Sequence, residues 1–373
     1  MGWDPFDGLN SKAFKAVPLI SSSRFMRLAF IQLFKRSPIN LRRIFLVPKG
    51  YNSKGLGLFL AGYCKEYKFS PTEAGKEKID HLVKLLLEQQ STEYSGSCWG
   101  YNFDWQARAF FQPKNTPTVV ASVFIASALL DAYEITNDES LLTTARSTCD
   151  FILKDLHRTY DGNGNFSFSY SPLDKSVVFN AGLLGSRLLA RVYSFTHEKE
   201  LIEAAKKSVA YSCNHQKSDG SWGYGILPYH QWVDSFHTGY NLECISDYMK
   251  FSGDNSFKAN ISSGFEYYIN NFFTDEGIPK YYNTSIYPID VHSPAQLVIT
   301  LAKLDESINH KPLLDKVLLW TIDNMQSPKG YFYYQANKFF TSKIPYIRWS
   351  QAWMFYALTT YIFEKPNSKD NQV

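Results

Sequence analysis

A turn with the same residue spacing occurs twice in the chain, as Gln216-Lys-Ser-Asp-Gly220-Ser-Trp222 and as Gln326-Ser-Pro-Lys-Gly330-Tyr-Phe332. Both copies place a Gly four residues after the Gln and an aromatic residue two residues after the Gly. Looser copies end at Trp99 or keep only the Gly of the turn, at Gly164 and Gly277. The copies lie about 55–67 residues apart, a period typical of stacked supersecondary units.

Each repeat predicts two helices of different character. Amphipathic, charged outer helices are predicted over 22–35, 72–90, 138–156, 198–216, 256–272 and 310–326. Inner helices, apolar nearly all round and therefore buried on several sides, are predicted over 54–67, 116–133, 178–195, 234–251, 288–304 and 346–363. Six pairs with bulky inner aromatics favour a closed (α/α)6 toroid of six helical hairpins over an open α-solenoid. We therefore expect one all-α domain over residues 1–373.

The N-terminal part is strongly basic. Residues 1–53 are predicted to be a basic extension that includes the first outer helix. Residues 8–65 contain eleven Lys or Arg and no Asp or Glu, which indicates an anionic partner such as lipid or an acidic glycan. The apolar segment 24–36 has basic ends, so it fits either the first outer helix or peripheral contact with an anionic membrane. Nucleic-acid binding would depend on this segment alone and is not expected.

The composition narrows the class of protein. Of the 373 residues 45% are hydrophobic and 20% charged, as in globular proteins, and 16% are aromatic, which suits a cleft that stacks on flat ligands. The five Cys form no Cys-x-x-Cys pair, so neither a disulfide framework nor a cysteine zinc site is expected. No apolar run reaches the length of a membrane span, and no secretory signal is visible. We expect a cytoplasmic protein, membrane-peripheral at most, without metal or cofactor.

The Gln-x3-Gly-x-Trp turn resembles the QW motif of terpenoid cyclases and protein prenyltransferases. The six-hairpin plan also resembles the glycoside hydrolases and polysaccharide lyases built on (α/α)6 barrels. The resemblance covers about residues 54–363 and implies a fold rather than a reaction, because the turn is a structural brace. In that brace the Gln caps a helix end and the aromatic residue packs between hairpins. The Asp-x-Asp-Asp motif of squalene–hopene-type cyclases and the zinc ligands of prenyltransferases are absent from the sequence.

In such a toroid the ligand enters among the loops that precede the inner helices. The first of these loops, 99–116, places Asp104 among Trp99, Tyr101, Trp105 and Arg108. A carboxylate surrounded by aromatic faces suits a sugar subsite. An Asp104–Arg108 pair that merely orders the loop is the alternative.

The third loop leads into a helix that is apolar except for several polar side chains near its start. Asp234 is placed to cap the helix, and His237, Tyr240 and Asn241 follow within two turns. Together with Trp232 before them, these side chains supply proton transfer, oxygen binding and a stacking face.

The fourth and last loops repeat the arrangement. His292, after Asp290, takes a position that matches His237 in the neighbouring repeat, and Asn180 sits about one residue earlier in its own helix. The last inner helix begins with a cationic, aromatic group, Arg348, Trp349 and Gln351. Asp290 fits catalysis and helix capping equally. We expect these residues to converge at one mouth of the toroid.

The residues at the predicted mouth favour a carbohydrate-active enzyme that acts on a glycan chain, an acidic one included. A glycoside hydrolase would use Asp104 with Asp234 or Asp290 as its carboxylate pair. A uronosyl lyase or C5-epimerase would instead use His237, Tyr240, His292, Asn180 and Arg348, without a carboxylate pair. The first reading is preferred, because hydrolysis is the commoner reaction on this architecture. A terpenoid or prenyl-binding enzyme and a non-catalytic scaffold stay open.

Overall fold

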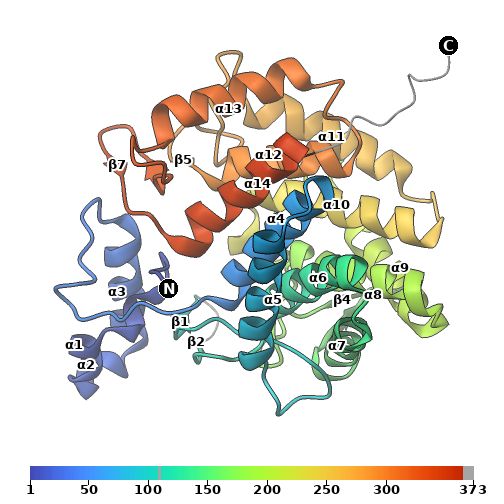
Figure 1. Cartoon of the computed structure of the whole chain (residues 1–373), viewed down its shortest axis with the longest axis horizontal. Helices are drawn as coiled ribbons and strands as arrows, with labels where there is room; N and C mark the ends of the chain where they lie inside the picture. The colour runs from blue at the N-terminus through green and yellow to red at the C-terminus, as the bar shows by residue number, and fades with distance from the viewer. Residues whose placement is uncertain (108–110, 364–373) are drawn as a thin grey trace.

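Six helices rich in small and apolar residues form an inner ring (Figure 1). The computed structural model describes residues 1–107 and 111–363. The inner helices are α4 (Ser53–Phe69), α6 (Val119–Thr136), α8 (Phe179–Thr196), α10 (Ser235–Ser252), α12 (His292–Lys303) and α14 (Trp353–Phe363). Each contacts the next, and α14 contacts α4. The ring is therefore closed, which confirms the predicted all-α (α/α)6 toroid.

The outer layer consists of helices that each pack on the inner helix before them. They are α5 (Glu73–Glu88), α7 (Glu139–Asp150), α9 (Lys199–Asn214), α11 (Lys258–Phe272) and α13 (Lys311–Met325). In α5, Ile79, Leu82 and Leu86 are buried on one stripe, as the 3.6-residue period of an amphipathic helix requires. The charged residues between them face outward, which accounts for the predicted outer character.

The helix α3 (Arg24–Arg36) does not take the predicted place of the first outer helix. It packs against η1 (Asp7–Asn10) and β1 (Trp105–Gln106), beside the ring (Figure 1). Its Ile31 belongs to a small cluster of the N-terminal segment that includes Leu9. Amphipathicity predicted correctly that one face is buried, but it carries no information on which surface covers that face.

The remaining elements are short and lie in the connections. The strands pair as β1–β2, β3–β4 and β5–β6–β7, all antiparallel. Their bounds are β2 (Phe111–Gln112), β3 (Arg158–Tyr160), β4 (Phe166–Phe168), β5 (Ile289–Asp290), β6 (Gln335–Ala336) and β7 (Thr341–Ser342). Short helices are α1 (Lys12–Lys15), α2 (Pro18–Ser21), η2 (Phe151–Asp155), η3 (Pro228–His230) and η4 (Ile347–Ala352). Only Val291 separates the end of β5 from the start of α12.

The repeated turn is a brace, as its sequence suggests. Gln216 Nε2 donates to the carbonyl of Gly220, and Trp222 Nε1 donates to the carbonyl of Ser212 at the end of α9. Gly220 has a φ of +88°, and a Cβ there would lie 2.3 Å from the Ser263 carbonyl. Only glycine suits that conformation and that contact with the neighbouring hairpin.

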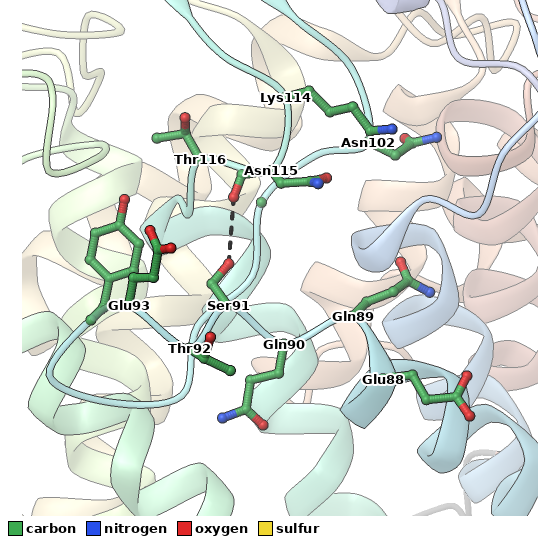
Figure 2. Close-up of a pocket in the computed structure, with 12 residues that line it drawn as sticks. Glu88, Gln89, Gln90, Ser91, Thr92, Glu93, Asn102, Lys114, Asn115 and Thr116 are labelled. Carbon is green, nitrogen blue, oxygen red and sulfur yellow. Dashed lines mark hydrogen bonds between the residues drawn. The ribbon is translucent and has the colours of Figure 1, made fainter.

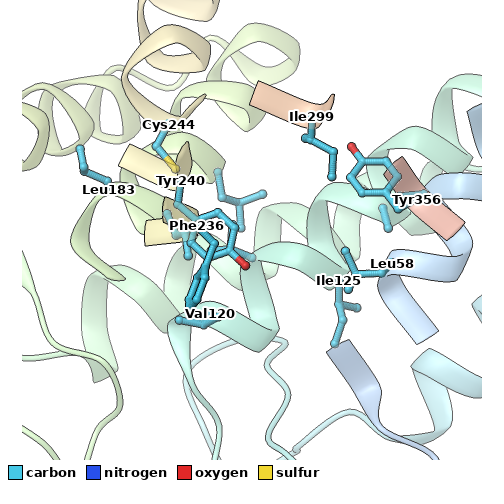
Figure 3. Packing of buried hydrophobic residues seen from close by; sticks show 14 of the residues in the cluster. Leu58, Val120, Ile125, Leu183, Phe236, Tyr240, Cys244, Ile299 and Tyr356 are labelled. Carbon is cyan, nitrogen blue, oxygen red and sulfur yellow. The ribbon is translucent and has the colours of Figure 1, made fainter. Parts of the chain in front are cut away.

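One helix of the described chain, α6, is long and apolar enough to cross a membrane. Two-thirds of that stretch is buried inside the toroid, where α6 is part of the inner ring. Figure 3 shows its Ile125 beside Leu58 of α4, with Ile299 of α12 and Tyr356 of α14 lining the same core. Its hydrophobicity is therefore accounted for by the core.

Replacing Trp222 with Ala should lower the free energy of unfolding by about 3–5 kcal/mol, because a large buried ring and its hydrogen bond are both lost. Chemical denaturation measures the change. Phe339→Ala is the matched control, since that ring is 88% exposed, and it should change stability by about 0.5 kcal/mol or less. A loss below about 1 kcal/mol for Trp222→Ala would contradict the role of the turn as a brace.

Candidate functional site

The N-terminal ends of the inner helices and the loops before them form one mouth of the toroid. Most of the predicted catalytic residues meet there. Asp234, His237 and Tyr240 come from the start of α10, and Asp290 and His292 from the junction of β5 with α12. The structure brings these five residues together: the rings of His237, Tyr240 and His292 follow one another in contact, and Asp234 and Asp290 each lie beside a histidine.

Asp234 and His237 form a hydrogen-bonded pair. Asp234 caps α10, with Oδ1 accepting the His237 backbone N–H at 3.0 Å, and its Oδ2 lies 2.7 Å from His237 Nδ1. Asp234 is buried, and Trp232 Nε1 also donates to it at 3.1 Å. The His237 side chain stays 22% exposed. The buried carboxylate thus fixes the ring and leaves the Nε2 edge for an incoming molecule.

Tyr240 and His292 form a second pair, deeper in the mouth. Tyr240 Oη and His292 Nε2 are 2.8 Å apart, and both side chains are buried. The His292 ring stacks on Phe236 at a centroid distance of 4.5 Å. Burial, helped by the positive charge of Lys54, holds the pKa of His292 well below its usual range. Burial also raises the pKa of Tyr240, so both partners are neutral and share one proton.

Asp290 is buried among hydrogen-bond donors. Its oxygens accept from Trp349 Nε1 at 2.8 Å, from the His292 backbone N–H at 3.0 Å and from Gln335 Nε2 at 3.1 Å. Burial raises the pKa of Asp290 to about 6, although these donors favour the charged form. Asp290 can therefore hold or release a proton near neutral pH.

Arg348 is held by the N-terminal segment of its own chain. Its Nε and Nη2 donate to the two oxygens of Asp4 at 2.6 and 2.8 Å. Beside this pair, Phe6 packs between Trp105 and Trp349, with centroid distances of 6.4 and 5.6 Å. The segment before α1 therefore covers one side of the mouth.

Lys35 extends from α3 toward the same place. Burial lowers its pKa, and the nearby carboxylates of Asp290 and Asp234 oppose that shift. Its ammonium also lies 5.0 Å from the centre of the Phe6 ring. A cation from the N-terminal segment thus faces the two acids of the mouth.

Lys54 is a mouth residue that sequence reasoning missed. Its Nζ lies 4.2 Å from the ring centre of Phe124, 5.2 Å from Trp353 and 5.5 Å from Tyr240. No carboxylate among the described residues lies within ion-pair distance of it. Burial, with a further contribution from Arg348, lowers the pKa of Lys54 well below its usual 10.5. A charged residue in the first turn of an otherwise apolar inner helix was the signal available.

Several predicted binding residues also line the mouth. Trp232 is partly exposed and stacks on Tyr224 at 4.7 Å, and Tyr101 lies under the Arg348 guanidinium at 5.0 Å. Asn180 and Asn241 are buried, and the Oδ1 atom of each lacks a hydrogen-bond partner in the described part of the protein.

Other predictions need correction. Trp99 is fully buried in the main core, where its Nε1 donates to the Leu86 carbonyl, so it offers no stacking face to a ligand. Gln351 exchanges two hydrogen bonds with the backbone of Phe332 and braces that turn. Both side chains therefore stabilise the repeated turns and do not line the mouth.

Asp104 lies on the rim and is held by two groups of the described residues. It accepts from the Lys114 backbone N–H at 2.8 Å and forms an ion pair with Lys15 at 2.9 Å. Arg108, its predicted partner, lies outside the described residues. Asp104 therefore ties the first loop to the N-terminal segment.

Two cavities lie away from the mouth residues. The larger, of about 510 Å³, is a polar hollow beside the end of α5, lined by Glu88, Gln90, Ser91, Asn102, Lys114 and Asn115, with Ser91 pointing toward Asn115 (Figure 2). The smaller, of about 180 Å³, lies between all six inner helices and contains Glu243, whose pKa burial raises to about 7. Across residues 1–107 and 111–363, no three His, Cys, Asp or Glu side chains come together as metal ligands.

No protein-family model matches the sequence, and no curated protein matches it. Solved structures do resemble the fold. A cellobiose 2-epimerase from Bacillus thermoamylovorans superposes with a TM-score of 0.67 at 13% identity, over 84% of this chain and 87% of that one. This chain shares the α/α toroid of that enzyme.

Two other toroids are similar to it. A family 76 α-mannanase from Bacteroides thetaiotaomicron gives a TM-score of 0.61 at 12% identity, over 83% of this chain and 86% of that one. A D-mannose isomerase gives 0.60 at 13% identity, over 84% and 86%. At such identities the likeness establishes the fold and leaves the reaction to the residues of the mouth.

Replacing Lys54 with Met should stabilise the protein at about pH 7 by about 1–3 kcal/mol, because an ammonium without a carboxylate partner no longer has to be buried. The contribution of Lys54 to the wild-type free energy of unfolding should rise with pH up to about 10, since the unfolded chain keeps a proton on Lys54 that the folded chain loses. Lys54→Met should lack this rise. Urea unfolding at several pH values measures both effects.

The exposed Lys207→Met variant is the control and should keep the wild-type pH dependence. Equal pH profiles for Lys54→Met and the wild type would contradict a lowered pKa at Lys54.

Proposed function

We propose that this protein is a carbohydrate-active enzyme that moves a proton at a sugar carbon, in an epimerisation, isomerisation or elimination. The observation that carries the proposal is the Asp234–His237 pair, in which a buried carboxylate orients a ring whose other edge is accessible. The similar toroids include an epimerase and an isomerase named for sugars, which supports the substrate class. The geometry favours this reaction over hydrolysis, because Asp234 and Asp290 are each occupied by several donors.

His237 would act as the base. With Asp234 accepting the Nδ1 proton, His237 Nε2 carries the lone pair and takes a proton from the carbon next to a carbonyl or carboxylate. The C–H bond breaks, an N–H bond forms, and the electron pair of the carbon becomes an enolate with its charge on oxygen. Donors from Lys54 and Arg348 would stabilise that oxygen.

The Tyr240–His292 pair would supply the second proton transfer. Its hydroxyl and imidazole share one proton inside the mouth, so Tyr240 can return a proton to the carbon while His292 keeps the hydroxyl oriented. Return to the opposite face gives an epimer. If the bond from the next carbon to its oxygen breaks instead, that oxygen leaves with the Tyr240 proton and an unsaturated sugar results.

A uronic acid is the favoured substrate class. Arg348 holds the carboxylate of Asp4 in bidentate geometry, and the carboxylate of an acidic sugar that displaced Asp4 would meet the same two donors. The carboxylate of such a sugar also acidifies the proton on the carbon next to it, and this is the proton that His237 would remove.

Proton exchange tests the proposal. In D₂O the protein should replace one carbon-bound proton of a uronic or neutral oligosaccharide with deuterium, seen as loss of its ¹H NMR signal. His237→Asn should slow the exchange by about 10²–10⁴-fold. His197→Asn is the matched control, since His197 is exposed at the end of α8. Glycan cleavage without exchange, at equal rates in both variants, would contradict the proposal.

A glycoside hydrolase is the second candidate, because Asp290 has a pKa of about 6 and fits a general acid. In that case Asp290→Asn should slow the release of reducing ends by about 10²-fold or more, while His237→Asn should leave the rate of release nearly unchanged. A thermal-shift panel with the same sugars and a prenyl diphosphate separates both from a terpenoid enzyme. Stabilisation by the diphosphate alone would favour the latter.

A further inference from the structure

The N-terminal segment exposes many large apolar side chains. Those of Leu19, Phe25 and Ile44 are 89, 76 and 72% exposed. We define the N-terminal apolar surface as the exposed side chains of Val17, Leu19, Ile20, Phe25, Met26, Leu33, Ile39, Ile44 and Leu46. Single exposed apolar residues are ordinary, but nine in a segment of thirty residues indicate a surface that is covered in use.

The helix α3 has two apolar faces. Ile31 and Phe34 are buried against the N-terminal segment, while Phe25 and Leu33 point the other way and are exposed. A surface helix normally shows charged residues on its outer face. The outer face of α3 therefore has the composition of a contact surface.

The charged residues of the segment that carries this surface are all basic. Residues 8–65 contain no acid, and Lys12, Arg36, Arg43 and Lys49 are exposed within them. Other cations of the segment are already used inside the protein, such as Arg42, which pairs with Asp7 at 2.6 Å. Exposed apolar side chains edged by Lys and Arg, with no acid, match an anionic lipid surface.

We propose that the N-terminal apolar surface docks the protein on an anionic lipid bilayer. The apolar side chains enter the boundary between headgroups and acyl chains, and the surrounding cations meet the lipid phosphates. The segment that docks is also the one that covers the mouth through Asp4 and Lys35. Docking does not depend on which sugar reaction the mouth performs.

Vesicle co-sedimentation tests the charge part. The full chain should bind phosphatidylcholine vesicles that contain phosphatidylglycerol, bind phosphatidylcholine alone more weakly, and lose affinity as salt rises. Each basic residue contributes about fivefold to partitioning, so Lys12→Gln, Arg36→Gln and Arg43→Gln together should weaken binding on the order of 100-fold. The control replaces the exposed Lys84, Lys207 and Lys258 with Gln and should bind as the wild type.

A second triple variant tests the apolar part. This variant combines Leu19→Ser, Phe25→Ser and Ile44→Ser, and each of the three changes should contribute about a tenfold loss of vesicle binding. The control changes Ile308, Leu319 and Ile362, which are also exposed, to Ser and should have no effect. Unchanged circular dichroism and melting confirm that every variant is folded.

Three results would overturn the proposal. The first is no binding of the wild type to anionic vesicles at low salt. The second is binding to polygalacturonate but not to vesicles, which would assign the cations to an acidic glycan. The third is a dimer in analytical ultracentrifugation that Leu19→Ser, Phe25→Ser and Ile44→Ser convert to monomer, which would assign the surface to a second copy of the chain.

Discussion

Closure of the inner ring between its first and last helices is the contact on which the rest of the structure depends. α4 and α14 come from opposite ends of the chain and pack closely because α4 is rich in glycine. A Cβ on Gly62 would lie 2.6 Å from the Phe355 ring, and one on Gly57 would lie 3.1 Å from Ile125 of α6. The backbone of α4 thus fits between its two neighbours. Once the ring is closed, the N-terminal ends of all six inner helices meet at one mouth.

The mouth collects polar groups that the core would otherwise exclude. Burying a charge is costly unless a partner meets it, and here almost every charge has one: Asp234 has His237, Asp290 has three donors, and Arg348 has Asp4. Partners of this kind fix the orientation of each group before a ligand arrives, which is what proton transfer requires. Lys54 departs from the pattern, since it meets ring faces rather than a carboxylate.

The N-terminal segment connects this chemistry to the outside of the molecule. Its inner side supplies Asp4, Phe6 and Lys35 to the mouth, and its outer side carries the N-terminal apolar surface. Residues 8–65 contain no acid, so the charges that this segment places near Asp234 and Asp290 and beside the exposed apolar residues are all positive. A segment that looks like a simple extension in the sequence is therefore part of the site.

The sequence by itself determined the toroid, its six inner helices and the places of His237 and His292 near the starts of two neighbouring inner helices, because helical periodicity and the Gln–Gly–aromatic turn are local patterns that recur at a regular spacing. Only the tertiary structure decided that Trp99 faces the core, that Lys54 lies among three rings, and that Asp4 holds Arg348. These are contacts between residues distant along the chain. Periodicity specifies which face of a helix is buried, but the direction of a side chain and the identity of its partner depend on how the closed ring brings separate segments together.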